Sequence, residues 1–277
     1  MKIKLFSYNV EDTFVHNLSG LTKLICFLLL TFAVMFSYDI RVILAILFFS
    51  LFVFKVSKIT FSQVKLMVIY VAVFILTNAI ISFFFSPEYG VKLYGTRHEI
   101  FSITDKVALT YEQLFYQVTK LFKYASVIPF GIIFLLTTNP SELASALAGV
   151  GVNYKASYAV ALTLRYFPDI QREYTDISQA QQARGLDLSK KAKLTDRFKN
   201  SLMIIVPLIF STLSRIELIS NAMDLRGFGK GKKRSWYNLK PLSRNDYIAI
   251  LLSLGIFILS ILVSVLINHS RFYNPFI

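Results

Sequence analysis

Two arginine–glycine pairs have the residue types and spacing that best suit a specific chemistry in this chain. They lie in Ala183-Arg184-Gly185 and Leu225-Arg226-Gly227, so the arginines at 184 and 226 are 42 positions apart. A guanidinium is planar, stays charged when water is removed, and pairs with a carboxylate through two parallel hydrogen bonds. The chemistry to expect is therefore recognition of acidic groups, not the making or breaking of bonds.

Each motif also has the residues that end a helix. Glycine just past a helix adopts the left-handed conformation that closes it, and arginine in the last turn suits the negative end of the helix dipole. A helix stop is the simpler interpretation of either motif alone. For the pair we favour a second interpretation, in which both helix tips dock into acidic grooves of partner proteins. Two tips indicate two partner subunits, or a dimer with two equivalent grooves.

Few other residues suggest covalent or metal chemistry. The single cysteine, Cys26, lies in an apolar run and has no partner for an internal disulfide. The three histidines are far apart in sequence, so we expect no metal site. Gly231-Lys232 resembles part of a phosphate-binding loop, but Arg226 stands at its earlier glycine position and Lys233 at its Ser or Thr position. Any ATP hydrolysis is therefore expected in another chain, and this chain should need no cofactor of its own.

Composition and charge place these motifs in a membrane protein. The chain has 277 residues, is 55% hydrophobic and carries a formal net charge of +14. Its apolar residues come in long blocks, and its charges come in other blocks. Excess lysine and arginine can bind nucleic acid, but beside apolar blocks they indicate cytoplasmic loops and contacts with anionic lipid headgroups. We therefore expect the lipid bilayer, and no nucleic acid, as a partner.

Five apolar runs are long enough, or nearly long enough, to cross the hydrocarbon core, which takes about 20 residues of helix. They are residues 21–38, 42–54, 66–85, 116–136 and 247–267. The predicted fold class is an all-α membrane protein with about five transmembrane helices. The loop 87–110 between the third and fourth runs has β-formers beside turn residues at 90–95, so a short hairpin and a plain connector are both open.

Lysine and arginine in the short flanks predict the orientation. They gather before the first run, between the second and third, and before the fifth, which lie on one side if there are five spans. That side is the cytoplasm, so the N-terminus is expected inside and the C-terminus outside. The predicted domains are a membrane domain of four spans at 1–138, a cytoplasmic coupling-helix domain at 139–246, and a final span with an outer C-terminus at 247–277.

The cytoplasmic section is predicted to hold one short helix and two long amphipathic helices. The short helix starts at Pro140, a residue suited to the first helical position, and runs to about 147. The long helices run from about 154 to 184 and from about 193 to 226, and each contains a proline that should bend it. Residues 202–213 are almost continuously apolar but short for a span. The alternative, a sixth span there, would invert the orientation of everything that follows.

Five segments, in order, carry a resemblance to a known family. They are residues 16–23, 137–143, 164–168, 181–185 and 215–228. With them the chain resembles, over most of its length, the T component of energy-coupling factor (ECF) transporters, a family that includes the cobalt and nickel transporter permeases. The resemblance implies a transmembrane scaffold subunit of an ECF-type ABC importer, multi-pass in a bacterial or archaeal cell membrane.

The resemblance also implies partners. In that family the membrane helices hold a small substrate-binding S component, and two arginines at the ends of the coupling helices each contact one of two ABC-type ATPases. Closure of the ATPase pair, which binds ATP and Mg, moves the helix tips and topples the S component, carrying a vitamin or metal ion inward. This chain would then be a non-catalytic energy-coupling subunit, and the S component would choose the substrate.

Carried onto this sequence, the resemblance assigns the coupling role to the two motifs. The residues that match the family's Ala-Arg-Gly pattern are Ala183, Arg184, Gly185, Arg226 and Gly227. Leu225 departs from that pattern, because the family usually has alanine there. A larger side chain at this position can change how closely the second tip fits its ATPase, so the strength or partner of the second contact is in question.

Two other functions stay open on sequence alone. A self-sufficient channel or secondary transporter needs a polar pathway, but the predicted spans carry almost no acidic residues, which such proteins use to relay protons or bind ions. A membrane-embedded lipid enzyme would gather carboxylates or histidines at the interface. Asp169, Glu173 and Asp176 lie together, but they fit better the solvated face of an amphipathic helix.

Overall fold

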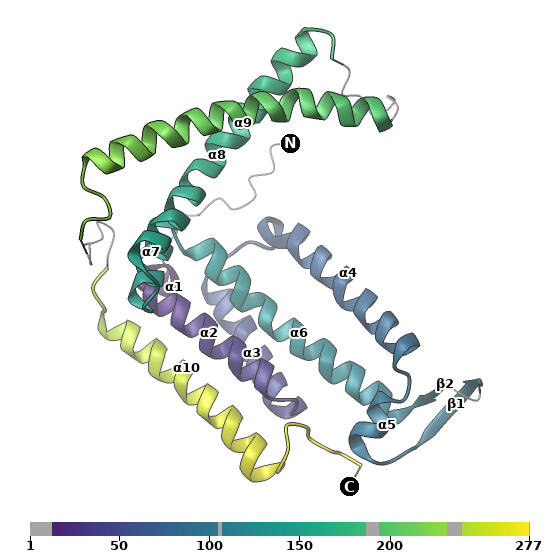
Figure 1. Ribbon diagram of the computed structural model, residues 1–277. Helices are drawn as coiled ribbons and strands as arrows, with labels where there is room; N and C mark the ends of the chain where they lie inside the picture. Colours follow the sequence, from purple (N-terminus) through teal and green to yellow (C-terminus); the bar gives the residue numbers. More distant parts are fainter. Residues whose placement is uncertain (1–12, 105–106, 187–193, 232–239, 277) are drawn as a thin grey trace. The chain divides into compact units, whose positions relative to one another are not determined.

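The structure, a computed structural model, describes residues 13–104, 107–186, 194–231 and 240–276. In these ranges its regular elements are helices and one small hairpin (Figure 1). In chain order they are α1 (Phe14–Asn17), α2 (Gly20–Phe36), α3 (Ile40–Val56), α4 (Phe61–Phe85), α5 (Tyr89–Tyr94), β1 (Glu99–Thr104), β2 (Val107–Thr110), α6 (Tyr111–Thr137), α7 (Pro140–Gly149), α8 (Tyr154–Ala183), α9 (Leu194–Leu225), α10 (Arg244–Leu262) and the π-helical turn η1 (Val263–Ile267).

The chain divides into two compact units. The first is formed by residues 1–139 and 240–277, and the second by residues 140–239. The first unit therefore holds α1 to α6, the hairpin and α10, whereas the second holds α7, α8 and α9. Both arginine–glycine motifs belong to the second unit.

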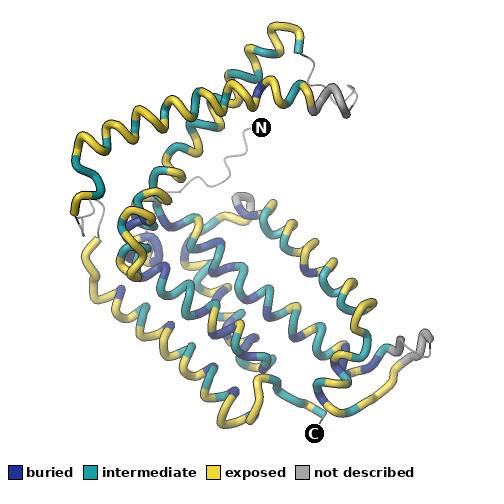
Figure 2. The backbone as a smooth tube through the Cα atoms, in the orientation of Figure 1, coloured by how far each residue is buried: buried dark blue, intermediate teal, exposed yellow. Residues whose placement is uncertain are grey.

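The first unit is a helix bundle in which α10 packs along α2 and α3 packs along α6. The centre of its core is formed by Leu30, Ala33, Val34, Ile46 and Phe130. Buried residues lie on the facing sides of these helices, while α4 and the outer side of α10 are mostly exposed (Figure 2). Most of the exposed large side chains on these helices are apolar, and the charged exceptions Lys65 and Arg244 lie near the starts of the two helices. Outward apolar faces of this kind are stable in hydrocarbon, so this unit is built for a membrane.

Among the residues that the structure describes, four helical stretches are long and apolar enough to cross a membrane, by length and composition. They are Val64–Phe85, Tyr111–Thr137, Lys199–Leu225 and Arg244–Ile267. The helices α2 and α3 have 17 residues each, which is at the short end of the roughly 17–25 residues that a span takes. The five runs predicted from the sequence thus correspond to α2, α3, α4, α6 and α10, and the all-α membrane fold is confirmed.

Side-chain caps set where two of these helices begin. The Ser19 hydroxyl accepts a hydrogen bond from the Thr22 N–H at 3.2 Å and starts α2. The Thr110 hydroxyl accepts one from the Gln113 N–H at 3.3 Å and starts α6. Such a cap satisfies an N–H group that has no partner inside the helix. The fourth predicted run therefore begins earlier than residue 116, because its polar first turns are still helical.

The helix α9 (Leu194–Leu225) extends well beyond its apolar central run at 202–213. Its candidate span covers Lys199–Leu225, which is 27 residues. The run 202–213 is short for a span by itself, but the helix continues past it in both directions and is long and apolar enough to cross a membrane. Length and composition alone do not distinguish a helix that crosses the membrane from one that lies along its surface.

The loop between α4 and α6 contains a helix and the hairpin. The strands β1 and β2 pair antiparallel. Residues 90–95 lie in α5 and its cap, not in a strand, so the β interpretation of those residues is wrong while the hairpin itself is present. Gly90 explains the difference: its N–H donates to the Gln113 side chain at 2.8 Å, and a Cβ on it would lie 2.6 Å from the Glu112 carbonyl oxygen. Only glycine lets α5 pack this closely on α6.

Lys123 is a buried lysine within α6 that already has partners. Its ammonium donates to the carbonyl oxygens of Met35 at 2.8 Å and Ser37 at 3.3 Å, and lies 3.3 Å from the centre of the Tyr38 ring. These carbonyls end α2, where the helix dipole is negative. The lysine therefore joins α6 to the end of α2, which accounts for a buried charge at this position of α6.

Candidate functional site

The first arginine–glycine motif forms the end of α8. The helix stops at Ala183, and Arg184 is its C-cap residue. Gly185 has φ +89°, and its N–H donates to the Gln182 carbonyl at 2.9 Å. The Leu186 N–H donates to the Gln181 carbonyl at 3.1 Å. This pair of bonds is the Schellman motif, in which glycine takes the left-handed conformation.

The second motif forms the end of α9 in the same way. Gly227 has φ +67°, and its N–H donates to the Asp224 carbonyl at 2.9 Å. The Phe228 N–H donates to the Met223 carbonyl, also at 2.9 Å. Both arginines therefore occupy the cap position of the same backbone structure. The prediction that each glycine ends a helix is confirmed by these bonds.

The residues at both tips are open to the surroundings. Ala183, Arg184, Gly185, Leu225 and Arg226 are exposed, and Gly227 is half-buried. Leu225 is 90% exposed, which is unusual for a large apolar side chain. Arginine is one of the residues enriched among those that contribute most to binding at the centre of a protein interface. The geometry thus suits docking, but it leaves the coupling role of these residues as a proposal.

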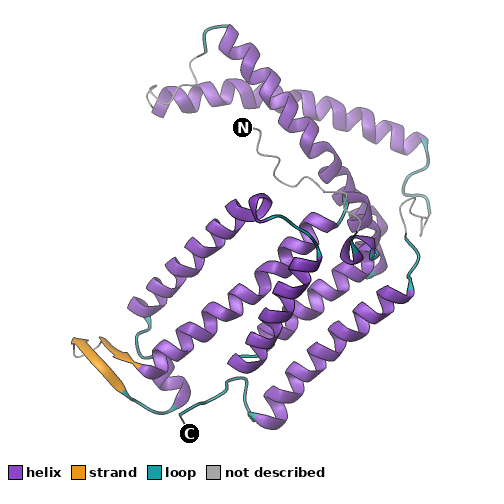
Figure 3. Cartoon of the chain, turned by 180° about the vertical axis from the view of Figure 1, so that it is seen from behind, coloured by secondary structure: helices purple, strands orange, loops and turns teal. Residues whose placement is uncertain are grey.

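The helices α8 and α9 cross each other and run in opposite directions (Figures 1 and 3). Near the crossing, Glu173 of α8 accepts hydrogen bonds from the Ser211 hydroxyl and from the Arg215 guanidinium, the latter at 2.9 Å. Further along, the ring of Tyr158 near the start of α8 meets Phe228, just past the end of α9. The C-terminal ends of the two helices therefore lie on opposite sides of the crossing. The crossing therefore keeps the two arginine-bearing helix ends apart from each other.

Glu173 differs from its expected role. The sequence pattern groups it with Asp169 and Asp176 on a solvated helix face, but its side chain is only 19% exposed and is bound by α9. Asp169 keeps a side chain that is 46% exposed, with a distant contact of 3.9 Å to Arg172. The interpretation therefore holds for Asp169 and is wrong for Glu173, whose carboxylate fastens the crossing.

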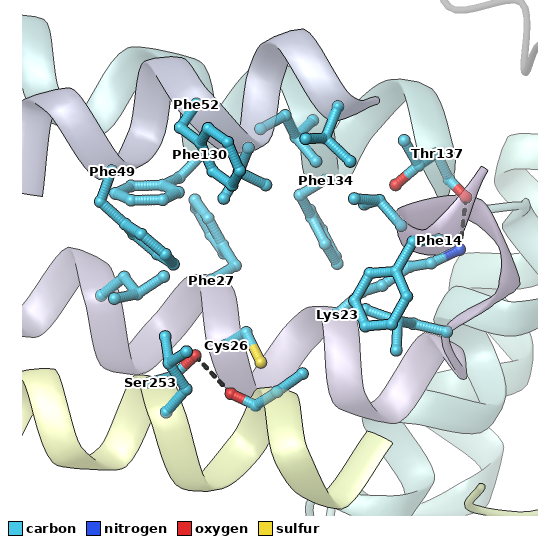
Figure 4. Close-up of a pocket in the computed structure, with 18 of the residues that line it drawn as sticks. Phe14, Lys23, Cys26, Phe27, Phe49, Phe52, Phe130, Phe134, Thr137 and Ser253 are labelled. Atoms are coloured by element: carbon cyan, nitrogen blue, oxygen red, sulfur yellow. Dashed lines mark hydrogen bonds between the residues drawn. The ribbon is translucent and has the colours of Figure 1, made fainter. Parts of the chain in front are cut away.

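The first unit has a cavity of about 290 Å³ between α1, α2, α3, α6 and α10 (Figure 4). Its lining is dominated by the rings of Phe27, Phe49, Phe130 and Phe134. At one end the Lys23 ammonium donates to the Thr137 carbonyl at 2.7 Å. A lining of this kind suits hydrocarbon rather than a polar cargo, because it offers few groups to replace water around a solute.

Sequence reasoning missed the aromatic contacts of Phe228. This ring lies 5.0 Å from the Tyr158 ring and 5.8 Å from the Tyr154 ring, measured between centres. The local signal was present, since Phe228 stands between two glycines, Gly227 and Gly229. Its partners could not be read from that signal, because they are at the far end of another helix.

Fold and site together define a helical membrane protein with two exposed helix ends that each carry an arginine. A family model described as "Cobalt transport protein", CbiQ, matches residues 11–237. The chain therefore belongs to the CbiQ cobalt transport protein family. This membership confirms the family resemblance drawn from the five sequence segments.

Three curated relatives that align with nearly the whole chain are each named energy-coupling factor transporter transmembrane protein EcfT. The relative from Streptococcus equi subsp. equi is 25% identical over 279 residues, covering 93% of this chain and 96% of its own. That from Clostridium kluyveri is 26% identical over 268 residues, covering 94% and 96%. That from Lactococcus lactis subsp. cremoris is 27% identical over 265 residues, covering 92% and 94%.

Proposed function

We propose that this chain is the non-catalytic transmembrane subunit of an ECF-type ABC importer, which transmits ATP-driven motion of two ATPase subunits to a small substrate-binding S component. The observation that carries the proposal is the pair of tips: two Schellman-ended helices with exposed arginines on opposite sides of one crossing. The family and the names of the relatives support it. ATP and Mg would be bound by the ATPases.

Each tip would take one ATPase. The guanidiniums of Arg184 and Arg226 are suited to grooves that contain carboxylates, because the planar fork pairs with them bidentately. When ATP draws the two ATPases together, the tips must move with them, and the α8–α9 pair must tilt or change its crossing. That movement would reach the S component, which would carry a vitamin or a metal ion inward.

We place the second unit on the cytoplasmic side of a bacterial or archaeal cell membrane, with the N-terminus inside and the C-terminus outside. The polar residues of α9 support this placement. Arg215 lies well inside the apolar stretch and pairs with Glu173 of α8, a helix with many charged residues. A charge at the centre of a span costs about 3 kcal/mol, so α9 is better placed along the interface than across the bilayer.

Labelling tests the placement. The variant Lys230→Cys, made in a Cys26→Ala background, should react with a membrane-impermeant thiol reagent in inside-out vesicles. It should stay unreacted in intact cells. Labelling in intact cells alone would contradict the proposed orientation and favour a sixth span.

Charge reversal at the tips tests the function. In the complex with ATPases and S component, Arg184→Glu and Arg226→Glu should each reduce uptake by at least about 30-fold, because loss of a desolvated charge pair costs upwards of about 2 kcal/mol. The matched control is Arg172→Glu on α8, whose side chain is 80% exposed and lies outside both motifs.

Normal uptake and normal co-purification of the ATPases with the Arg184→Glu, Arg226→Glu double variant would sink the coupling role. Transport by the purified chain alone in liposomes, without ATP, would replace it with the channel or secondary-transporter function. Turnover of a lipid by the purified chain would favour the enzyme alternative.

A further inference from the structure

The chain just beyond the second tip turns back onto the start of α8. Gly227 and Gly229 both have positive φ, at +67° and +94°, so the backbone reverses twice around Phe228. The Phe228 ring then lies 5.0 Å from the Tyr158 ring and 5.8 Å from the Tyr154 ring. These distances are typical of interacting aromatic pairs. Tyr154 and Tyr158 are one helical turn apart, so they offer the ring a single face of α8.

The backbone at Gly229 makes a second contact with α8, against the Lys155 side chain. It is so close that a Cβ added to Gly229 would lie 3.3 Å from the ammonium nitrogen of Lys155. The tip of α9 is therefore held to the first turns of α8 by an aromatic cluster and by close backbone packing. We call Tyr154, Tyr158 and Phe228 the clasp.

The first tip differs at the equivalent position. Leu186 stands where Phe228 stands in the second tip, one residue beyond the glycine. Residues 181–186 contain no aromatic residue, and the side-chain contact described between them and α9 is the Gln181 amide, whose nitrogen lies 3.5 Å from the Met203 carbonyl oxygen. The two tips thus share a backbone but differ in how they are fastened to the crossing helix.

We propose that Phe228 is a positioning residue that makes the Arg226 tip and the start of α8 move as one body. The inference rests on the proposed function, because it concerns how motion of the ATPase reaches the helix pair. Displacement travels through contiguous packed groups. Without the clasp, a pull on Arg226 would be taken up by rotation of the backbone at Gly227 and Gly229, and α8 would receive less of it.

The test measures binding and coupling separately in the reconstituted complex with both ATPases and the S component. Phe228→Ala should leave co-purification of the ATPases within about twofold of wild type, but reduce the substrate imported per ATP hydrolysed by about fivefold. Phe228→Tyr keeps the ring and should restore that ratio. Tyr158→Ala should mimic Phe228→Ala, and the double variant should be little worse than either one, because both remove the same contact.

Two outcomes separate this inference from the proposed function. If the Arg184→Glu, Arg226→Glu double variant leaves ATPase binding and uptake normal, the proposed function falls and the clasp falls with it. If Arg226→Glu is defective but Phe228→Ala imports normally per ATP, the clasp alone is overturned. A proportional loss of ATPase binding and uptake in Phe228→Ala, with normal import per ATP, would also overturn it, since Phe228 would then only shape the docking surface.

A linked variant tests the clasp independently if Phe228→Ala folds poorly. In a Cys26→Ala background, the variant Tyr158→Cys, Phe228→Cys lacks both rings of the contact, so before linking it should import about fivefold less substrate per ATP hydrolysed, like Phe228→Ala. Joining the two cysteines with a short bifunctional thiol reagent reconnects the tip to α8 and should return that ratio to within about twofold of the Cys26→Ala parent. Loss of import on linking would show that the contact must open during the cycle and would overturn the proposal.

Discussion

The two helix tips have the same backbone and different neighbours. Both end in a Schellman motif with arginine at the cap and glycine at positive φ. Before the arginine, the first tip has Ala183 and the second has Leu225; two residues after it, the first has Leu186 and the second has Phe228. The comparison indicates that the shared backbone fixes how each arginine is presented. The neighbouring side chains then decide how each tip meets its partner and how firmly it is fastened to α8 or α9.

Both tips present an arginine at the helix cap, and replacing it in Arg184→Lys and Arg226→Lys is expected to have the largest effect on uptake. Lysine keeps the charge but cannot form the bidentate pair with a carboxylate, so each variant should reduce ATP-dependent uptake by about tenfold. Arg172→Lys on the exposed face of α8 is the matched control and should behave as wild type. Equal losses at both tips would support equivalent docking, whereas a loss at only one would show that the tips do not play the same role.

The next prediction concerns the contact of Glu173 at the point where α8 and α9 cross. Glu173→Ala should lower the free energy of unfolding of the second unit by about 1.5 kcal/mol, because the Ser211 and Arg215 side chains lose a charged acceptor. Asp169→Ala, on the exposed face, should change it by less than about 0.5 kcal/mol. Thermal unfolding of the detergent-solubilised protein compares the two. If Asp169→Ala were the more damaging, the assignment of the crossing contact would be wrong.

A smaller effect tests whether the two tips have the same backbone energetics. Gly185→Ala and Gly227→Ala should each destabilise the last helical turn by about 1 kcal/mol, because an L-residue is strained at positive φ. A Cβ at Gly185 would meet nothing within 4 Å, and one at Gly227 would meet only the Lys230 side chain at 3.6 Å, so no clash adds to either cost. Hydrogen exchange of the last turns of α8 and α9 measures both. Clearly unequal effects would contradict the shared structure.

The sequence predicted the features that depend on residues close together in the chain, but not the contacts between residues far apart. The ends of α8 and α9 were predictable because glycine and arginine act on the turn that contains them. The pairing of Glu173 with Arg215 was not, because periodicity along one helix does not say which face a second helix will cover. The clasp was hidden for the same reason, since Phe228 and Tyr158 meet only when α8 and α9 run antiparallel. Gly90 in α5 shows the same limit, because its close packing on α6 goes with a helix in residues that look like β-formers.

The smallest effect concerns the residue at which the two tips differ most plainly. Leu225 is 90% exposed, and if its partner covers it on docking, Leu225→Ala should weaken ATPase binding at that tip by about threefold, because less apolar area is buried. The reciprocal variant, Ala183→Leu, should not gain affinity at the first tip, since a groove shaped for alanine has no room for leucine. Titration of the ATPases onto the reconstituted complex compares the two. Tighter binding by Leu225→Ala would contradict this prediction. It would mean that the ATPase groove at the Arg226 tip fits alanine better than leucine.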